Sequence, residues 1–101
     1  MLSLIKARGV SMQPAIDDGN YLITKKPRHF QAGLIYIVDH IDLGRIVKRL
    51  ERVEGEYAYF TGDNKASTPQ SLIGKVELAR IKAQVIFIIG KTGLKLSLIH
   101  I

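Results

Sequence analysis

Short apolar runs, separated by glycine, proline or charged residues, recur along the whole chain. Runs of this length that are rich in Ile, Val, Leu and Tyr are typical of β-strands rather than helices. The pattern predicts strands at Leu2–Ala7, Tyr21–Lys25, Leu34–Val38, Arg45–Val53, Tyr57–Phe60, Ala79–Ile89 and Leu94–Ile101. A compact hairpin connection is expected at 54–56 and a longer one at 40–44. Helix is expected only as one turn near Pro14, because proline suits the first helical position.

These elements predict a mainly β fold. We expect a single compact antiparallel or mixed β domain over residues 1–101, with a sheet that is partly closed or coiled to limit its exposed edges. The last predicted strand alternates apolar and polar residues up to its final position. An unpaired strand of this kind would leave an exposed edge, so a homodimer through the C-terminal strand is one expectation.

The charge and the composition narrow the class of partner. The net charge is +6, but the basic residues are loosely grouped and no aromatic residues are interleaved with them. Surfaces that bind single-stranded nucleic acid combine both features, so no nucleic-acid partner is expected. The chain has no cysteine, which excludes disulfides, cysteine zinc sites and thiol nucleophiles. The three histidines lack metal-ligand spacing, so no metal and no cofactor are expected.

The apolar runs also bear on location. None approaches the roughly 20 residues that a membrane-spanning helix needs. The N-terminal run is too short for a secretory signal peptide. We therefore expect a soluble protein that is cytoplasmic or peripheral to a membrane.

One short motif has the character of a nucleophile turn. The sequence Gly9-Val10-Ser11-Met12-Gln13-Pro14 follows the first predicted strand directly. A serine between a glycine and a proline is expected on a tight turn that exposes its hydroxyl, with Met12 packed beneath it. Serine is a weak nucleophile that needs an adjacent base. Taken alone, the motif favours the simpler interpretation of Ser11 as a polar turn residue.

A second motif supplies a candidate base. Side chains alternate between the two faces of a strand. The alternation places Lys48 with Ile46 and Leu50 on an apolar face, which we expect to point inward. The opposite, more charged face is expected to point outward and contains Arg45, Val47, Arg49 and Glu51. Burial lowers the pKa of a lysine and makes it a general base. The alternative is a lysine that extends its amine into water at a sheet edge.

Taken in order, these segments resemble the type I signal peptidases and the LexA-type self-cleaving repressors. Residues 9–14 match the nucleophile box of that superfamily, a serine followed by Met, any residue and Pro. Residues 18–23 are similar to the acidic glycine turn and strand that follow, and 47–50 to the lysine box. Residues 62–74 are similar to the glycine-aspartate-asparagine box. The short separation of Ser11 and Lys48 is closest to the LexA type.

The resemblance implies a signal-peptidase-like serine endopeptidase. Ser11 would attack the scissile carbonyl, and a neutral Lys48 would accept its proton. Ser67 would orient the Lys48 amine, and the backbone N–H groups of Ser11 and Val10 would form the oxyanion hole. Its substrate would be a peptide or protein with small residues near the cut, added as a strand to a sheet edge. Only ten residues precede Ser11, so cleavage of another chain is expected.

The last box implies supporting roles and also shows departures. Asp63 and Asn64 would shape the loop that carries Ser67. Gly9 replaces a hydroxyl residue that many relatives place there as an oxyanion donor, and 69–71 lack the family's acidic and basic pair. These departures keep open an alternative, a catalytically inactive peptide-binding or regulatory module with the same fold. A triad in which His40, beside Asp39, serves Ser11 is the competing catalytic arrangement.

Overall fold

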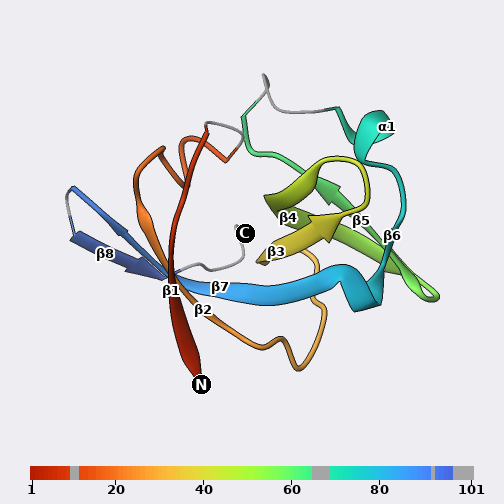
Figure 1. Cartoon of the computed structure of the whole chain (residues 1–101), viewed down its shortest axis with the longest axis horizontal. Helices are drawn as coiled ribbons and strands as arrows, with labels where there is room; N and C mark the ends of the chain where they lie inside the picture. Colours follow the sequence, from red (N-terminus) through yellow and green to blue (C-terminus); the bar gives the residue numbers. More distant parts are fainter. Residues whose placement is uncertain (10–11, 65–68, 92, 97–101) are drawn as a thin grey trace.

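One antiparallel sheet makes up most of the chain in the computed structural model (Figure 1). The structure describes residues 1–9, 12–64, 69–91 and 93–96. The strands lie in the order β1-β2-β7-β3-β4-β5-β6, and β8 pairs with β7. They are β1 (Leu2–Lys6), β2 (Tyr21–Lys25), β3 (Ile35–His40), β4 (Gly44–Glu54), β5 (Tyr57–Thr61), β6 (Val76–Glu77), β7 (Ile81–Gly90) and β8 (Gly93–Leu96). The mainly β fold is confirmed, and the described part of the sheet is open, with β1 and β6 at its ends.

Strand β7 connects two halves of the sheet. Its residues 81–84 pair with β3, residues 84–89 pair with β2, and residues 87–90 pair with β8. One half therefore consists of β1, β2, β8 and the end of β7. The other half consists of β3, β4, β5, β6 and the beginning of β7.

Strand β3 lies between two hydrophobic clusters. Ile35 and Ile37 face a cluster with Leu22, Val85, Ile88 and residues of the segment after β1. On the opposite face, Tyr36 and Val38 join a second cluster, which contains Leu50, Ala58, Phe60, Ile73, Val76 and Ile81. Burial on both faces explains why β3 is a continuous apolar run in the sequence rather than an alternating one.

The predicted boundaries differ from the structure mainly at the ends of strands. Ala79 and Arg80 belong to a 3₁₀ turn, η1 (Leu78–Arg80), which precedes β7. The predicted helical turn near Pro14 is wrong, since residues 12–15 form a hydrogen-bonded turn without helix. A helix that the pattern missed is α1 (Gln70–Ile73), too short to show helical periodicity. Positions 97–101 of the predicted last strand lie outside the described residues.

Helices contribute little to the described part of the chain. None of those helices has the length and apolar character that crossing a membrane requires.

Candidate active site

The backbone on both sides of position 11 is fixed by specific contacts. Val10 and Ser11 themselves lie outside the described residues. Before them, the Gly9 N–H donates a hydrogen bond to the Asp18 carboxylate, with 2.8 Å between N and Oδ1. After them, Met12 is buried in the first hydrophobic cluster, and its carbonyl accepts a hydrogen bond from the Ile16 N–H. The predicted nucleophile box is therefore anchored at both ends, and Met12 packs in the core as expected.

The backbone conformation at position 9 explains why this residue is a glycine. Its φ angle is +91°, in the left-handed region that side chains with a Cβ rarely adopt. A serine or threonine in this conformation would be strained. The departure from the family pattern at Gly9 therefore occurs where the chain enters the turn with a left-handed backbone conformation.

Lys48 is buried, as the strand alternation predicted. Its side chain is only 2 % exposed, and it lies on β4 opposite Tyr36 of β3. No hydrogen bond or ion pair joins its amine to any residue within the described ranges. Burial in these surroundings lowers the pKa of Lys48, because the charged ammonium loses its hydration. The alternative, in which the lysine extends into water, is therefore wrong.

This burial predicts a pH-dependent stability. Unfolding restores the ordinary pKa of Lys48, so between the two pKa values the unfolded chain binds more protons, and stability rises with pH. Lys48→Met should remove that rise and add about 1–3 kcal/mol to the free energy of unfolding at neutral pH. Urea denaturation of both proteins from neutral to alkaline pH measures the difference. A difference that stays constant across this range would contradict the prediction.

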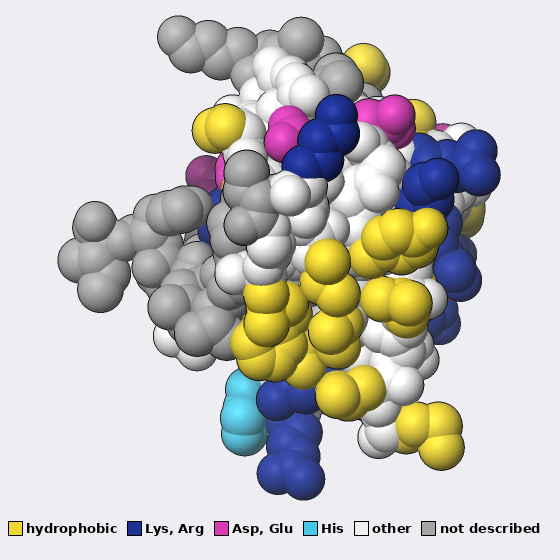
Figure 2. All heavy atoms as spheres, turned by 90° about the vertical axis from the view of Figure 1, so that its left-hand side faces the viewer, with side chains coloured by type: hydrophobic (Ala, Val, Ile, Leu, Met, Phe, Trp, Pro, Cys, Tyr) yellow, Lys and Arg dark blue, Asp and Glu magenta, His cyan; other side chains and the backbone are white. Residues whose placement is uncertain are grey.

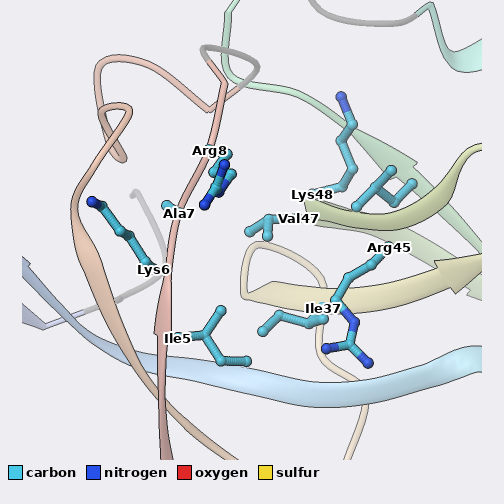
Figure 3. Close-up of a pocket in the computed structure, with 9 residues that line it drawn as sticks. Ile5, Lys6, Ala7, Arg8, Ile37, Arg45, Val47 and Lys48 are labelled. Atoms are coloured by element: carbon cyan, nitrogen blue, oxygen red, sulfur yellow. The ribbon is translucent and has the colours of Figure 1, made fainter.

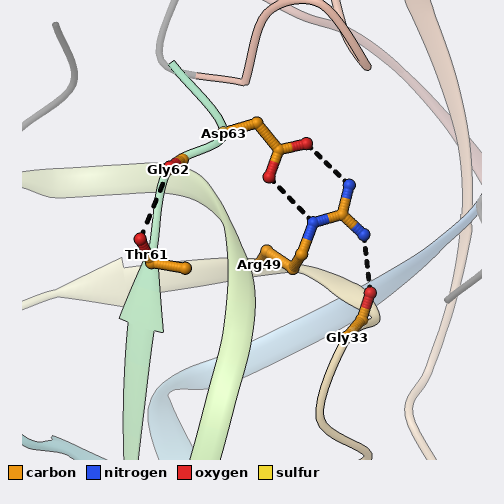
Figure 4. A network of polar contacts seen from close by, with 5 residues as sticks. All are labelled: Gly33, Arg49, Thr61, Gly62 and Asp63. Carbon is orange, nitrogen blue, oxygen red and sulfur yellow. Dashed lines mark hydrogen bonds and ion pairs between the residues drawn. The ribbon is translucent and has the colours of Figure 1, made fainter. Parts of the chain in front are cut away.

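Arg49, the next residue, clamps three segments together. Its guanidinium forms a bidentate ion pair with Asp63, in which the Nη2–Oδ2 distance is 2.6 Å and the Nε–Oδ1 distance is 2.8 Å (Figure 4). It also donates to the Gly33 carbonyl at 2.6 Å. The side chains of Arg49 and Asp63 are only 12 % and 16 % exposed. Strand β4 is thereby tied to the loop after β5 and to the turn before β3.

The clamp corrects one expectation about β4. The face that contains Val47 and Arg49 was predicted to point outward because it is mostly charged. Instead, Val47 packs against the first hydrophobic cluster, and Arg49 is covered by the loop of Asp63. Arg45 and Glu51 are exposed as expected. The charge of Arg49 is offset by a partner that is distant in the sequence, so alternation along one strand gave no sign of its burial.

A further contact links the same loop to the nucleophile turn. The Asn64 amide donates to the side-chain oxygen of Gln13, with 3.5 Å between Nδ2 and Oε1. Ser67 lies outside the described residues. The loop after β5 therefore contacts residues that are close in sequence to the predicted site residues. Asn64, three residues before Ser67, bonds to Gln13, two residues after Ser11. Asp63 pairs with Arg49, the residue after Lys48.

His40 has a structural role. Its Nδ1 accepts hydrogen bonds from the backbone N–H groups of Asp42 and Leu43, each at 3.1 Å. Its Nε2 lies 2.7 Å from the Ile73 carbonyl, so it must carry the proton and donate. Asp39 pairs with Arg45 instead of His40. Both ring nitrogens are therefore hydrogen-bonded to backbone groups, and neither is available as the base of a Ser-His-Asp triad.

A pocket of about 340 Å³ lies between β1 and β4 (Figure 3). It is lined by Ile5, Lys6, Ala7, Arg8, Ile37, Arg45, Ile46, Val47 and Lys48. In Figure 3, Ile5, Ile37 and Val47 project into the space between the two strands. The contribution of β1 was not foreseen from the sequence, since its approach to β4 results from the curl of the sheet.

Two strand edges border this pocket. Among the described strands, β1 pairs with β2 alone. Strand β5 begins to pair with β4 at Arg49, so residues 44–48 of β4 have an edge that β5 does not use. An extended peptide finds unpaired backbone groups on such edges.

The comparison with family models agrees with this geometry. A model described as Peptidase S24-like matches residues 2–91, a span that includes the nucleophile turn, β4 and the loop of Asp63. The chain belongs to the Peptidase S24-like family. Membership confirms the resemblance to the LexA-type superfamily and agrees with the mainly β fold of this S24-like chain. No curated protein matches the chain at significant similarity.

Proposed function

We propose that this S24-like chain is a serine endopeptidase that uses Ser11 as nucleophile and Lys48 as general base. The observation that supports it most strongly is the buried Lys48 amine, whose pKa is lowered and which has no partner in the described part of the chain. A lysine is usually either exposed to water or, when buried, paired with an acidic group. In this proposal the neutral amine accepts the proton of the Ser11 hydroxyl and so activates it.

The proposed reaction proceeds in two steps. The Ser11 hydroxyl oxygen bonds to the scissile carbonyl carbon while its proton passes to the Lys48 amine. The C–N bond then breaks, and the Lys48 ammonium returns the proton to the leaving amine. In the second step a water molecule loses a proton to Lys48 and attacks the acyl carbon. The acyl–oxygen bond breaks, Ser11 recovers its proton from Lys48, and the acid product is released.

The remaining predicted residues support these steps. Ser67 accepts or donates a hydrogen bond that aims the Lys48 amine, and the backbone N–H groups of Ser11 and Val10 stabilise the oxyanion. The observed contacts of Asp63 and Asn64 favour a structural role in this proposal, since they hold the loop that leads to Ser67 against Arg49 and Gln13.

The substrate in this proposal is an extended peptide with small side chains beside the cut. The pocket between β1 and β4 is lined by the apolar residues Ile5, Ile37 and Val47 and also by Lys48. Its unpaired strand edges suit the backbone of an added strand. A volume of about 340 Å³ suits a few small side chains better than several large ones.

Cleavage of an alanine-rich peptide, followed by mass spectrometry, tests the proposal. Wild-type protein should cut the peptide, whereas Ser11→Ala and Lys48→Ala should each lose at least about 10²-fold in kcat/KM. Lys75→Ala is the matched control, because Lys75 lies over the Tyr57 ring, away from the pocket. Equal rates for all four proteins would rule out the dyad.

A second function, peptide binding without cleavage, is favoured by one observation. Gly9 leaves the turn without the side-chain donor that many relatives place at this position, and a donor of this kind contributes about 10²–10³ in rate. In the same assay, saturable peptide binding without any cleaved product would support this function.

A further inference from the structure

One face of the β1-β2-β7-β8 half of the sheet is apolar and exposed. The inner side of these strands packs on the first hydrophobic cluster through residues such as Leu22 and Ile88. The opposite side has no described element over it. We call it the outer face, and it consists of Leu2, Leu4, Lys6, Tyr21, Ile23, Lys25, Phe87, Ile89 and Leu94.

The strand register places these side chains in adjacent rows. Lys6 is opposite Tyr21, Tyr21 is opposite Ile89, and Ile89 is opposite Leu94. In the next row, Leu4 is opposite Ile23 and Ile23 is opposite Phe87. The apolar residues are therefore neighbours on adjacent strands and form one continuous surface.

The exposure of this surface is unusually high for leucine. Leu2, Leu4 and Leu94 are 59 %, 62 % and 60 % exposed. Figure 2 shows hydrophobic side chains gathered into one patch on the side of the molecule where β1, β2 and β8 lie, with Lys and Arg at its margins. Continuous apolar patches of this kind on a protein surface mark a site of interaction with a partner or a membrane.

The charges on the outer face indicate which kind of partner binds it. The outer face includes Lys6 and Lys25, and the described parts of β1, β2, β7 and β8 contain no aspartate or glutamate. On the face itself, Lys6 lies over the Tyr21 ring at 6.0 Å, and Lys25 is opposite Leu2. A second copy placed face to face would bring lysines together, whereas anionic phosphate groups would neutralise them.

We propose that the outer face binds the surface of an anionic lipid bilayer. The leucines and Ile89 enter the boundary between headgroups and acyl chains, and Lys6 and Lys25 contact lipid phosphates. Tyr21 lies between them with an apolar ring and a polar hydroxyl, which suits the same depth. This inference does not depend on the peptidase activity.

Co-sedimentation with vesicles tests the proposal. The full chain should bind vesicles of phosphatidylcholine mixed with phosphatidylglycerol, bind vesicles of phosphatidylcholine alone far less, and lose affinity as salt is added. Leu4→Ser should weaken binding about tenfold, because it removes one inserted side chain. Leu72→Ser is the matched control, since Leu72 is 67 % exposed but lies on α1, away from the outer face.

A charge-reversal pair tests the electrostatic part. Lys25→Glu should weaken vesicle binding about tenfold or more, and Lys75→Glu, which changes the net charge equally on the β6 side, should leave it nearly unchanged. Equal melting temperatures of the variants and wild type show that folding is intact. Absence of vesicle binding, equal loss in Leu4→Ser and Leu72→Ser, or a dimer that Leu4→Ser dissociates without any vesicle binding would each overturn the proposal.

Discussion

Replacing Lys48 by arginine is expected to abolish peptide cleavage even though the positive charge is kept. The proposed reaction needs a neutral nitrogen that accepts the Ser11 proton, and a guanidinium does not lose its proton in proteins. General-base catalysis contributes about 10²–10⁴ in rate, so kcat/KM should fall by a factor in that range. The wild-type enzyme should become more active as pH rises through the lowered pKa of Lys48, and then level off.

Three controls separate the loss of a base from the loss of the fold. Lys75→Arg makes the same exchange outside the pocket and should cleave at the wild-type rate. Lys48→Met fits the buried position without a charge, so it should fold well and still be inactive. Melting curves of all variants identify any that have lost their structure. Cleavage by folded Lys48→Arg at close to the wild-type rate would show that Lys48 is not the base.

The strands were predictable from the sequence because their signal is local. Each apolar run between turn residues is read within a few positions, so Tyr21–Lys25 appears in the structure with the predicted bounds. The burial of Lys48 followed in the same way from its neighbours Ile46 and Leu50. In each case the pattern depends only on the alternation of side chains along one strand.

The pocket and the clamp depend on distant contacts that such a pattern does not contain. The pocket requires β1 and β4 to approach each other through the curl of the sheet, and no spacing in the sequence records that curl. The pairing of Arg49 with Asp63 joins residues on different elements. The sequence indicated this pair only by the presence of Arg49 beside Lys48 and of Asp63 in the last box.

Breaking the Arg49–Asp63 clamp is expected to destabilise the fold strongly. Arg49→Met leaves the Asp63 carboxylate largely covered and without its bidentate partner, and the Gly33 carbonyl loses a donor. Removing one partner of a buried ion pair costs several kcal/mol, so we expect a loss of about 2–4 kcal/mol in the free energy of unfolding. Urea denaturation at neutral pH measures this value.

The neighbouring arginine on β4 provides the matched control for the clamp. Arg52 pairs with Glu51 and Glu54, but its side chain is 46 % exposed, so Arg52→Met should cost less than about 1 kcal/mol. The double variant Arg49→Met/Asp63→Leu should be more stable than Arg49→Met alone, since it no longer covers an unpaired carboxylate. Equal costs for Arg49→Met and Arg52→Met would mean that the clamp contributes no more than a surface ion pair. The loop that leads to Ser67 would then need another support.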